Sequence, residues 1–228
     1  MAAGYLLPGV IMKNVNVDIK GVIFDLDGVL VDTAKFHYIA WKKIADDLQL
    51  DFNIEDNEKL KGVSRKKSLE IILDLNHKVI SEEDKGKLLE SKNNYYLELI
   101  KTLDESDVLP GVKNLISQIQ AQGIRIALGS ASKNAKVILT STGIIHHFDQ
   151  LVDGNMVSKA KPDPEVFITA AKLLNLEPQN CVVFEDAEAG VEAALAAEMR
   201  VIGVGDKVVL CKATRVAADL CDFNINSL

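Results

Sequence analysis

Three carboxylates follow a short apolar run, and this feature constrains the chain more than any other. The run is Val22 to Phe24, and the carboxylates are Asp25, Asp27 and Asp32. An apolar run without polar alternation predicts a strand buried on both faces, as in a parallel sheet. The carboxyl ends of such strands are where open α/β sheets bind ligands. We therefore expect Asp25 and Asp27 to lie at a functional site.

The closeness of Asp25 and Asp27 limits the chemistry of that site. Two neighbouring carboxylates repel each other unless a cation lies between them or one keeps its proton. The pair therefore suggests a divalent metal, one nucleophilic carboxylate and one acid/base. A solvated turn is the alternative, because Asp-x-Asp is common on protein surfaces. The site is favoured by the buried strand before the pair and by the sequence after it, Gly28-Val29-Leu30-Val31-Asp32-Thr33.

Composition restricts the class of protein. The 228 residues are 48% hydrophobic and 26% charged, which predicts a globular chain with one large domain or one domain and an insertion. With a net charge of −7, the chain lacks the excess of basic residues that is typical of nucleic-acid-binding proteins. Cys181, Cys211 and Cys221 are odd in number and lack metal-ligand spacing, which argues for a reducing cytosol. The apolar stretch from Tyr5 to Met12 is too short for a signal peptide, so we expect a cytoplasmic protein without membrane association.

A helix is predicted directly after Thr33. Its apolar stripe is formed by Phe36, Ile39, Ala40, Ile44 and Leu48. Thr33, His37 and Trp41 are spaced four residues apart, so they lie along another face of the same helix. That face begins beside the Asp pair. Taken alone, His37 and Trp41 would be interpreted as packing beneath a helical lid. Their position next to the acidic motif favours a role in the site.

A basic loop follows residues 50–58, which are polar and expected to be irregular. The loop reads Leu60-Lys61-Gly62-Val63-Ser64-Arg65-Lys66-Lys67-Ser68. Ser64 can cap a helix here, and the N–H groups at a helix N-terminus suit an anion. A solvated basic turn is the other interpretation. Ser81 then begins a long helix that carries Lys92 and is expected to end near Leu103.

Helices and strands are predicted to alternate from Leu109 onward. Strands are expected at 124–128, 150–152, 181–184 and 200–204, and helices at 112–122, from about 133, at 164–175 and at 187–198. Such alternation indicates βαβ units and a parallel sheet. The predicted fold class is α/β, a Rossmann-like doubly wound parallel sheet core with an inserted helical cap domain. We assign residues 1–18 to an N-terminal extension, 19–33 and 109–228 to the core, and 34–108 to the cap.

Further polar groups are expected where later strands end. Ser130-Ala131-Ser132-Lys133-Asn134 forms a strand-to-helix turn with hydroxyls and a lysine, which is typical of phosphate binding. Lys161 precedes a helix that Asp163 is expected to cap, and Glu185-Asp186 form a second acidic pair. Each group alone is also compatible with an ordinary turn or a surface lysine. Four carboxylates at one sheet edge need a cation, and oxygen ligands beside a phosphate favour Mg²⁺.

The acidic motif resembles the first motif of the haloacid dehalogenase superfamily of aspartate-based phosphotransferases. The remaining groups follow in the order that this superfamily uses, and the resemblance covers the chain beyond the N-terminal extension. Within the superfamily, the sequence is similar to the β-phosphoglucomutase family. One departure is Ala187, where a serine commonly follows the acidic pair. The resemblance implies that the substrate contacts are Thr33, His37, Trp41, Leu60, Lys61, Gly62, Val63, Ser64, Arg65, Ser68, Lys92, Ser130, Ala131, Ser132, Lys133, Asn134 and Lys161.

The resemblance also implies a reaction. Asp25 would be the nucleophile and Asp27 the acid/base, and Mg²⁺ would be held by Asp25, the Asp27 backbone carbonyl and Asp186 with Glu185 near. The reaction would interconvert β-D-glucose 1-phosphate and D-glucose 6-phosphate through an aspartyl phosphate and β-glucose 1,6-bisphosphate, which serves as priming intermediate. The expected partner is a small phosphosugar, and we expect a monomer.

Two other functions remain open at this point. One is a sugar-phosphate phosphatase, in which water takes the phosphoryl group from Asp25. The other is a non-catalytic phosphosugar-binding regulator on the same fold. The complete set of Asp25, Asp27, Lys161 and Asp186 argues against the regulator, because binding alone needs no nucleophile.

Overall fold

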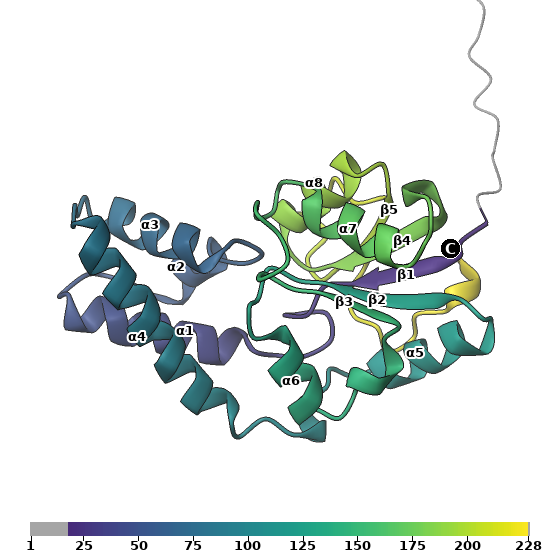
Figure 1. Ribbon diagram of the computed structural model, residues 1–228, viewed down its shortest axis with the longest axis horizontal. Coiled ribbons are helices and arrows are strands. Elements are labelled where there is room, and N and C mark those ends of the chain that lie inside the picture. Colours follow the sequence, from purple (N-terminus) through teal and green to yellow (C-terminus); the bar gives the residue numbers. More distant parts are fainter. Residues whose placement is uncertain (1–17, 228) are drawn as a thin grey trace, which may run out of the picture.

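The structure is a computed structural model that describes residues 18–227. The N-terminal extension predicted for residues 1–18 therefore lies, except for residue 18, outside the described residues. The chain forms a parallel sheet with helices on both faces and a separate group of helices beside the carboxyl edge of the sheet (Figure 1). This is the α/β, Rossmann-like fold class that the sequence predicts.

The sheet has six strands in the order β3-β2-β1-β4-β5-β6, and all neighbouring pairs are parallel. The strands are β1 (Gly21–Phe24), β2 (Arg125–Gly129), β3 (Gln150–Val152), β4 (Cys181–Glu185), β5 (Arg200–Val204) and β6 (Arg215–Ala217). Strand β1 lies between β2 and β4, where the strand order reverses direction. Ligands bind at this point in open α/β sheets, because the loops leave the sheet on opposite faces and open a crevice.

Strand β1 is buried on both faces, as its apolar sequence predicts. Val22 and Phe24 belong to one hydrophobic cluster, and Ile23 belongs to the cluster on the opposite face. The first cluster is closed by α5 (Val112–Ala121) and α6 (Ala135–Ser141). The second is closed by α7 (Glu165–Leu173) and α8 (Glu188–Ala196). Helices on both faces anchor the strand ends that carry the polar groups.

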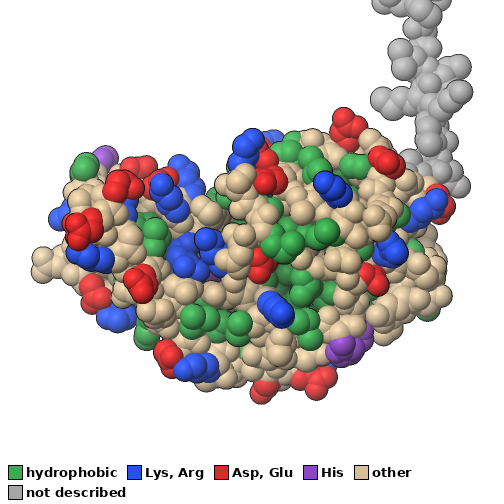
Figure 2. Space-filling view, in the orientation of Figure 1, with side chains coloured by type: hydrophobic (Ala, Val, Ile, Leu, Met, Phe, Trp, Pro, Cys, Tyr) green, Lys and Arg blue, Asp and Glu red, His purple; other side chains and the backbone are tan. Residues whose placement is uncertain are grey.

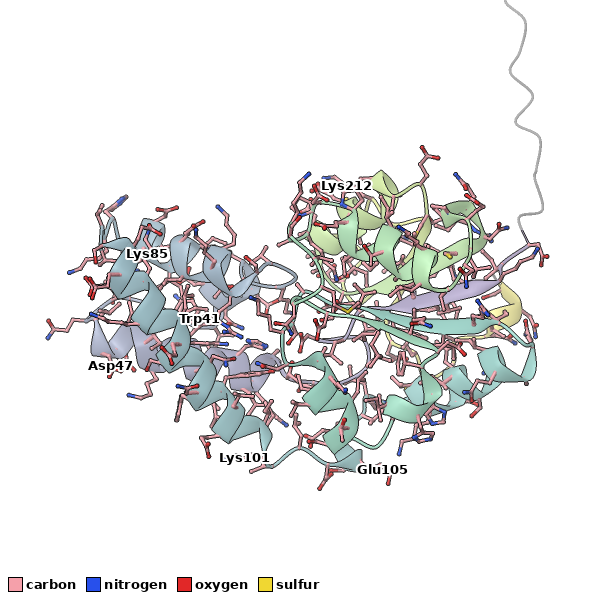
Figure 3. The ribbon with its side chains drawn as sticks, viewed as in Figure 1. Trp41, Asp47, Lys85, Lys101, Glu105 and Lys212 are labelled. Carbon is pink, nitrogen blue, oxygen red and sulfur yellow. The ribbon has the colours of Figure 1, made fainter. Side chains whose placement is uncertain are left out.

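The remaining helices form a group that we call the helical insertion. It consists of α1 (Ala34–Asp47), α2 (Ile54–Glu58), α3 (Arg65–Leu75) and α4 (Glu82–Ile100). The chain leaves the sheet at Val31 and returns beside it at Val108, where the two residues form an antiparallel bridge. The insertion has its own buried cluster, which includes Trp41, Phe52, Leu69 and Ile72. Figure 3 shows Trp41 among these helices, whereas Asp47 and Lys85 point outward.

Several local predictions were wrong. Residues 50–58 are not all irregular, because Asn53 and Asp56 form a capping box that begins α2. The buried line of α1 includes Trp41, whereas Ile39 from the predicted stripe is 41% exposed. Pro164 occupies the N-cap of α7, and Asp163 accepts from the Glu165 N–H at 3.0 Å instead. The short edge strand β6 was not expected.

Other helix signals are confirmed. Ser64 caps α3 by accepting a hydrogen bond from the Lys67 N–H at 3.2 Å. Ser81 caps α4 by accepting from the Asp84 N–H at 3.1 Å. Helix α4 ends at Ile100, slightly before the predicted end at Leu103. In residues 18–227, no helix is long and apolar enough to cross a membrane.

Candidate active site

Asp25 and Asp27 lie at the carboxyl end of β1. Asp25 Oδ2 accepts a hydrogen bond from the Asp27 N–H at 3.1 Å. The hydroxyl of Thr33 donates to Asp27 Oδ1. Thr33 is the N-cap residue of α1, but its side chain makes no capping hydrogen bond to that helix. Gly28 has a φ of +76°, and a Cβ added there would lie 2.1 Å from Asp186 Oδ2. Glycine is therefore required both for the turn and for the close approach of a second carboxylate.

The environment of Asp27 suits a group that exchanges protons near neutral pH. Burial and the neighbouring charge of Asp25 raise the pKa of Asp27 to about 7, although Lys161 and Lys92 oppose the shift. A carboxyl group with this pKa can both accept and donate a proton at pH 7. The Thr33 hydroxyl fixes one of its oxygens. The raised pKa and the fixed side chain of Asp27 are compatible with a general acid/base.

Lys161 joins the two acidic pairs. Its Nζ donates to Asp25 Oδ1 at 2.5 Å and to Glu185 Oε2 at 2.8 Å. Burial alone would lower the pKa of Lys161, but the carboxylates of Asp25 and Glu185 raise it above its usual value. The amine therefore stays protonated. A fixed cation at Asp25 can offset negative charge that develops on a transferred group.

The carboxylates at the sheet edge fit a divalent cation. One oxygen each of Asp25, Glu185 and Asp186 lies within 4.8 Å of the others. Burial raises the pKa of Glu185 to about 7, and burial together with Glu185 and Asp25 raises the pKa of Asp186 well above its usual value. Both pKa shifts arise from burial and from repulsion between neighbouring carboxylates. A divalent cation would relieve this repulsion, and hard oxygen donors suit Mg²⁺. The Asp27 side chain is turned toward Thr33 and does not belong to this cluster.

A second polar group faces the acidic cluster from the helical insertion. Lys92 on α4 contacts His37 on α1, with 2.9 Å between Lys92 Nζ and His37 Nδ1. Burial, Lys92 and Arg65 hold the pKa of His37 well below its usual range. His37 is therefore neutral. When Lys92 is protonated its amine can only donate to Nδ1, which leaves the ring proton on Nε2. The ring can thus donate a hydrogen bond from Nε2.

Lys92 is held in an aromatic setting. Its Nζ lies 5.0 Å from the Trp41 ring centroid and 4.5 Å from that of Tyr96. Burial and the positive charge of Arg65 lower the pKa of Lys92 to about 7. A buried lysine that pairs with no carboxylate among residues 18–227 is costly, so its presence favours a functional role.

The basic loop and the turn after β2 lie on the same cleft. Arg65 is partly buried at the first position of α3, and within residues 18–227 it makes no ion pair with a carboxylate. Lys61 Nζ pairs with Glu58 at 2.7 Å. In the turn, Ser130 Oγ accepts from the Ser132 N–H at 3.1 Å. Figure 2 shows Lys and Arg side chains in the hollow between the insertion and the sheet domain.

The structure brings nearly all the predicted site residues together around one cleft of about 1170 Å³. Thr33 and Glu185 do not line it, and both lie beneath its wall, hydrogen-bonded to Asp27 and Lys161 respectively. The predicted residues that line the cleft are Asp25, Asp27, His37, Trp41, Leu60, Lys61, Gly62, Val63, Ser64, Arg65, Ser68, Lys92, Ser130, Ala131, Ser132, Lys133, Asn134, Lys161 and Asp186.

Residues 19–198 match the family model of the haloacid dehalogenase-like hydrolases. The chain belongs to this family. It is 41% identical to the β-phosphoglucomutase of Bacillus subtilis, over 92% of this chain and 93% of the relative. The crystal structure of β-phosphoglucomutase from Clostridium difficile superposes with a TM-score of 0.89 at 43% identity, covering 92% of this chain and 95% of that one. A phosphorylated carbohydrates phosphatase of Thermotoga maritima is 31% identical, over 81% of this chain and 85% of its own length.

Two contacts of the site, one between rings and one a hydrogen bond, were missed by sequence reasoning. Tyr96 is 1% exposed, and its ring centroid lies 4.2 Å from that of His37. The Asn93 side-chain oxygen accepts from Asn134 Nδ2 at 3.0 Å and so links α4 to the turn after β2. Tyr96 lies four residues after Lys92 and shares its helix face, which is the signal that could have identified it.

Proposed function

We propose that this member of the haloacid dehalogenase family is a β-phosphoglucomutase, with residues 34–108 as its cap domain. The observation that carries the proposal is a cleft with two opposed polar sides. The acidic cluster and Lys161 lie on the sheet side, and Arg65, His37 and Lys92 lie on the side of the insertion. A substrate with two phosphate positions fits this arrangement, because each side offers cations for one phosphate.

The first chemical step takes place at Asp25. One carboxylate oxygen attacks phosphorus in line with the bond to the leaving oxygen, and an aspartyl phosphate forms as that bond breaks. Lys161 and Ser130 stabilise the negative charge on the phosphoryl oxygens. Bound Mg²⁺, held by Asp25, the Asp27 backbone carbonyl and Asp186 with Glu185 near, would supply further positive charge at these oxygens.

The second step uses Asp27. The 6-hydroxyl of β-glucose 1-phosphate attacks the phosphoryl group on Asp25, and Asp27 takes the hydroxyl proton, which yields β-glucose 1,6-bisphosphate. The bisphosphate then turns around, and Asp25 attacks its 1-phosphate. Asp27 returns the proton to the departing sugar oxygen, so glucose 6-phosphate leaves and the aspartyl phosphate is restored.

The insertion distinguishes the sugar from water. Arg65 would hold the phosphate that is not transferred, because a guanidinium matches two phosphate oxygens. Neutral His37 would donate from Nε2 to the sugar, with Lys92 fixing its ring. All these side chains come from one chain, and we propose that the enzyme acts as a monomer.

The function is tested by incubating the protein with Mg²⁺, trace β-glucose 1,6-bisphosphate and either anomer of glucose 1-phosphate. We expect glucose 6-phosphate from the β anomer, with little free phosphate. Release of free phosphate from many sugar phosphates at the same rate would favour the phosphatase that is the alternative. No turnover with Mg²⁺ would support the binding regulator.

The role of Arg65 separates mutase from phosphatase. Hydrogen bonds to charged groups contribute about 1.5 to 3 kcal/mol each, so losing two of them in Arg65→Ala should reduce transfer to the sugar by about 10² to 10⁴-fold. Hydrolysis of the aspartyl phosphate by water should change much less. Lys67→Ala is the matched control, because Lys67 is an exposed cation two positions further along α3 and does not line the cleft. An equal fall in both reactions would contradict this role of Arg65.

A further inference from the structure

The helical insertion touches the sheet domain through a contact between two very small residues. Gly62, on the loop between α2 and α3, has a φ of +71°, and a Cβ added there would lie 2.9 Å from the Cβ of Ala187. The same added atom would lie 3.9 Å from the Ala189 Cβ and from the Gly190 nitrogen. The loop of the insertion thus rests on the first turn of α8, and neither side has room for another carbon atom.

The first turn of α8 also encloses Glu185. The Ala187 N–H donates to Glu185 Oε1 at 3.0 Å. A Cβ added at Gly190 would lie 2.0 Å from the Glu185 carboxyl carbon, so this turn is packed directly against the carboxylate. Glu185 in turn accepts from Lys161, which donates to Asp25. The surface that receives the loop is therefore the one that shapes the reacting end of the cleft.

The loop also carries groups that line the cleft. Lys61 precedes Gly62, and Arg65 follows at the start of α3. The distance between the Arg65 guanidinium and Asp25 consequently depends on how closely Gly62 approaches α8. The hydrogen bond between Asn93 and Asn134 joins the two parts at another point of the cleft.

We propose that Ala187 is a positioning residue whose methyl group is the stop against which Gly62 settles when the insertion closes over the cleft. The inference rests on the proposed function. The Ala187 side chain is a single methyl group, which sets the distance of the loop from α8 by its size alone. A larger side chain would hold the loop away, move Arg65 from the distal phosphate and admit water to the aspartyl phosphate.

The first test enlarges Ala187. In Ala187→Val we expect transfer to β-glucose 1-phosphate to fall by about 10-fold to 10²-fold, since an error of about 1 Å in placing reacting groups has effects of that order. Phosphate released per glucose 6-phosphate formed should rise by a similar factor. Ala196→Val is the matched control, because Ala196 is exposed at the far end of the same helix. A purely structural role would lower both reactions and the melting temperature without changing their ratio, which would overturn the inference.

The second test exchanges the sizes of the two residues. Gly62→Ala should also reduce transfer relative to hydrolysis, partly through its left-handed backbone. Adding Ala187→Gly removes the clashing methyl group, while the backbone strain of Gly62→Ala remains. The double variant should therefore regain several-fold of the transfer-to-hydrolysis ratio. If the transfer-to-hydrolysis ratio of the double variant did not recover, the proposed role of Ala187 would be wrong. Failure of the wild-type protein to make glucose 6-phosphate would refute the proposed function instead, which keeps the two failures distinct.

Discussion

Lys92 allows the sharpest test of how this site trades stability for function. The side chain is 1% exposed, and its Nζ contacts His37 and the two rings of Trp41 and Tyr96. Methionine has a similar length and is apolar, so Lys92→Met removes the charge without leaving a large cavity. We expect this variant to lose transfer activity and to be more stable than the wild-type protein.

The magnitude follows from the pKa of Lys92, which burial and Arg65 lower from 10.5 to about 7. At about 1.4 kcal/mol per pKa unit, this corresponds to about 5 kcal/mol of destabilisation when both states are protonated. Between about pH 7 and 10.5 the unfolded chain keeps the proton that the folded chain loses, so the wild-type protein gains stability as the pH rises. The advantage of Lys92→Met should be about 4 kcal/mol at pH 7 and about 1 kcal/mol at pH 10.

Thermal unfolding followed by circular dichroism measures this difference. A domain of this size shifts by about 2 to 4 °C per kcal/mol, so Lys92→Met should melt about 8 to 16 °C higher at pH 7, with most of that gap gone at pH 10. Lys87→Met is the matched control: Lys87 lies on the same helix but is 68% exposed and pairs with Glu83 at 2.7 Å. We expect it to change stability by about 0.5 kcal/mol or less. A lower melting temperature for Lys92→Met, or a gap that does not change with pH, would refute the reasoning.

Two further predictions concern the acidic pair. Asp25→Asn should abolish the acid-stable, base-labile acyl phosphate that phosphate labelling detects, because an amide oxygen is a poor nucleophile; labelling at the wild-type level would show that another residue carries the phosphoryl group. Asp27→Asn should slow sugar turnover by about 10² to 10⁴-fold while Mg²⁺ binding measured by calorimetry persists, because the carboxylate cluster does not include the Asp27 side chain; turnover close to the wild-type rate would exclude the acid/base role.

The sequence predicts β1, β2, β4 and β5 well because these strands are buried over most of their length. Ile23 and its two neighbours have no polar alternation, and only a central parallel strand satisfies such a run. The acidic cluster follows from the same rule, since the carboxyl ends of β1 and β4 are adjacent and bring Asp25 and Glu185 together. The edge strand β6 carries no such signal, because its residues are exposed or half-buried.

The helical insertion is harder to predict because its helices pack on one another rather than on a sheet. The capping box of α2, Asn53 and Asp56, was present in the sequence, but the helix has one turn and little apolar content. Tyr95 and Tyr96 are adjacent, and only the packing of α4 against α1 decides that Tyr96 is the one buried against His37. Local periodicity identifies the helix, but the choice between two adjacent aromatic residues depends on tertiary packing.

The difference between a mutase and a phosphatase lies in a part of the structure that local sequence does not encode. Both proposed activities use Asp25, Lys161 and the carboxylates of Glu185 and Asp186. Asp25, Glu185 and Asp186 lie at strand ends, and Lys161 lies in the loop before α7. Under the proposed function, the two activities differ in how long the aspartyl phosphate is shielded from water. This shielding depends on how closely two surfaces far apart in the chain meet. Glycine and alanine are common residue types, so the sequence does not mark Gly62 and Ala187 as special. Only the folded structure shows that a Cβ added at Gly62 would lie 2.9 Å from the Ala187 Cβ. The sequence therefore predicts the residues of the acidic cluster, whereas the choice between water and a sugar hydroxyl as phosphoryl acceptor depends on tertiary contacts.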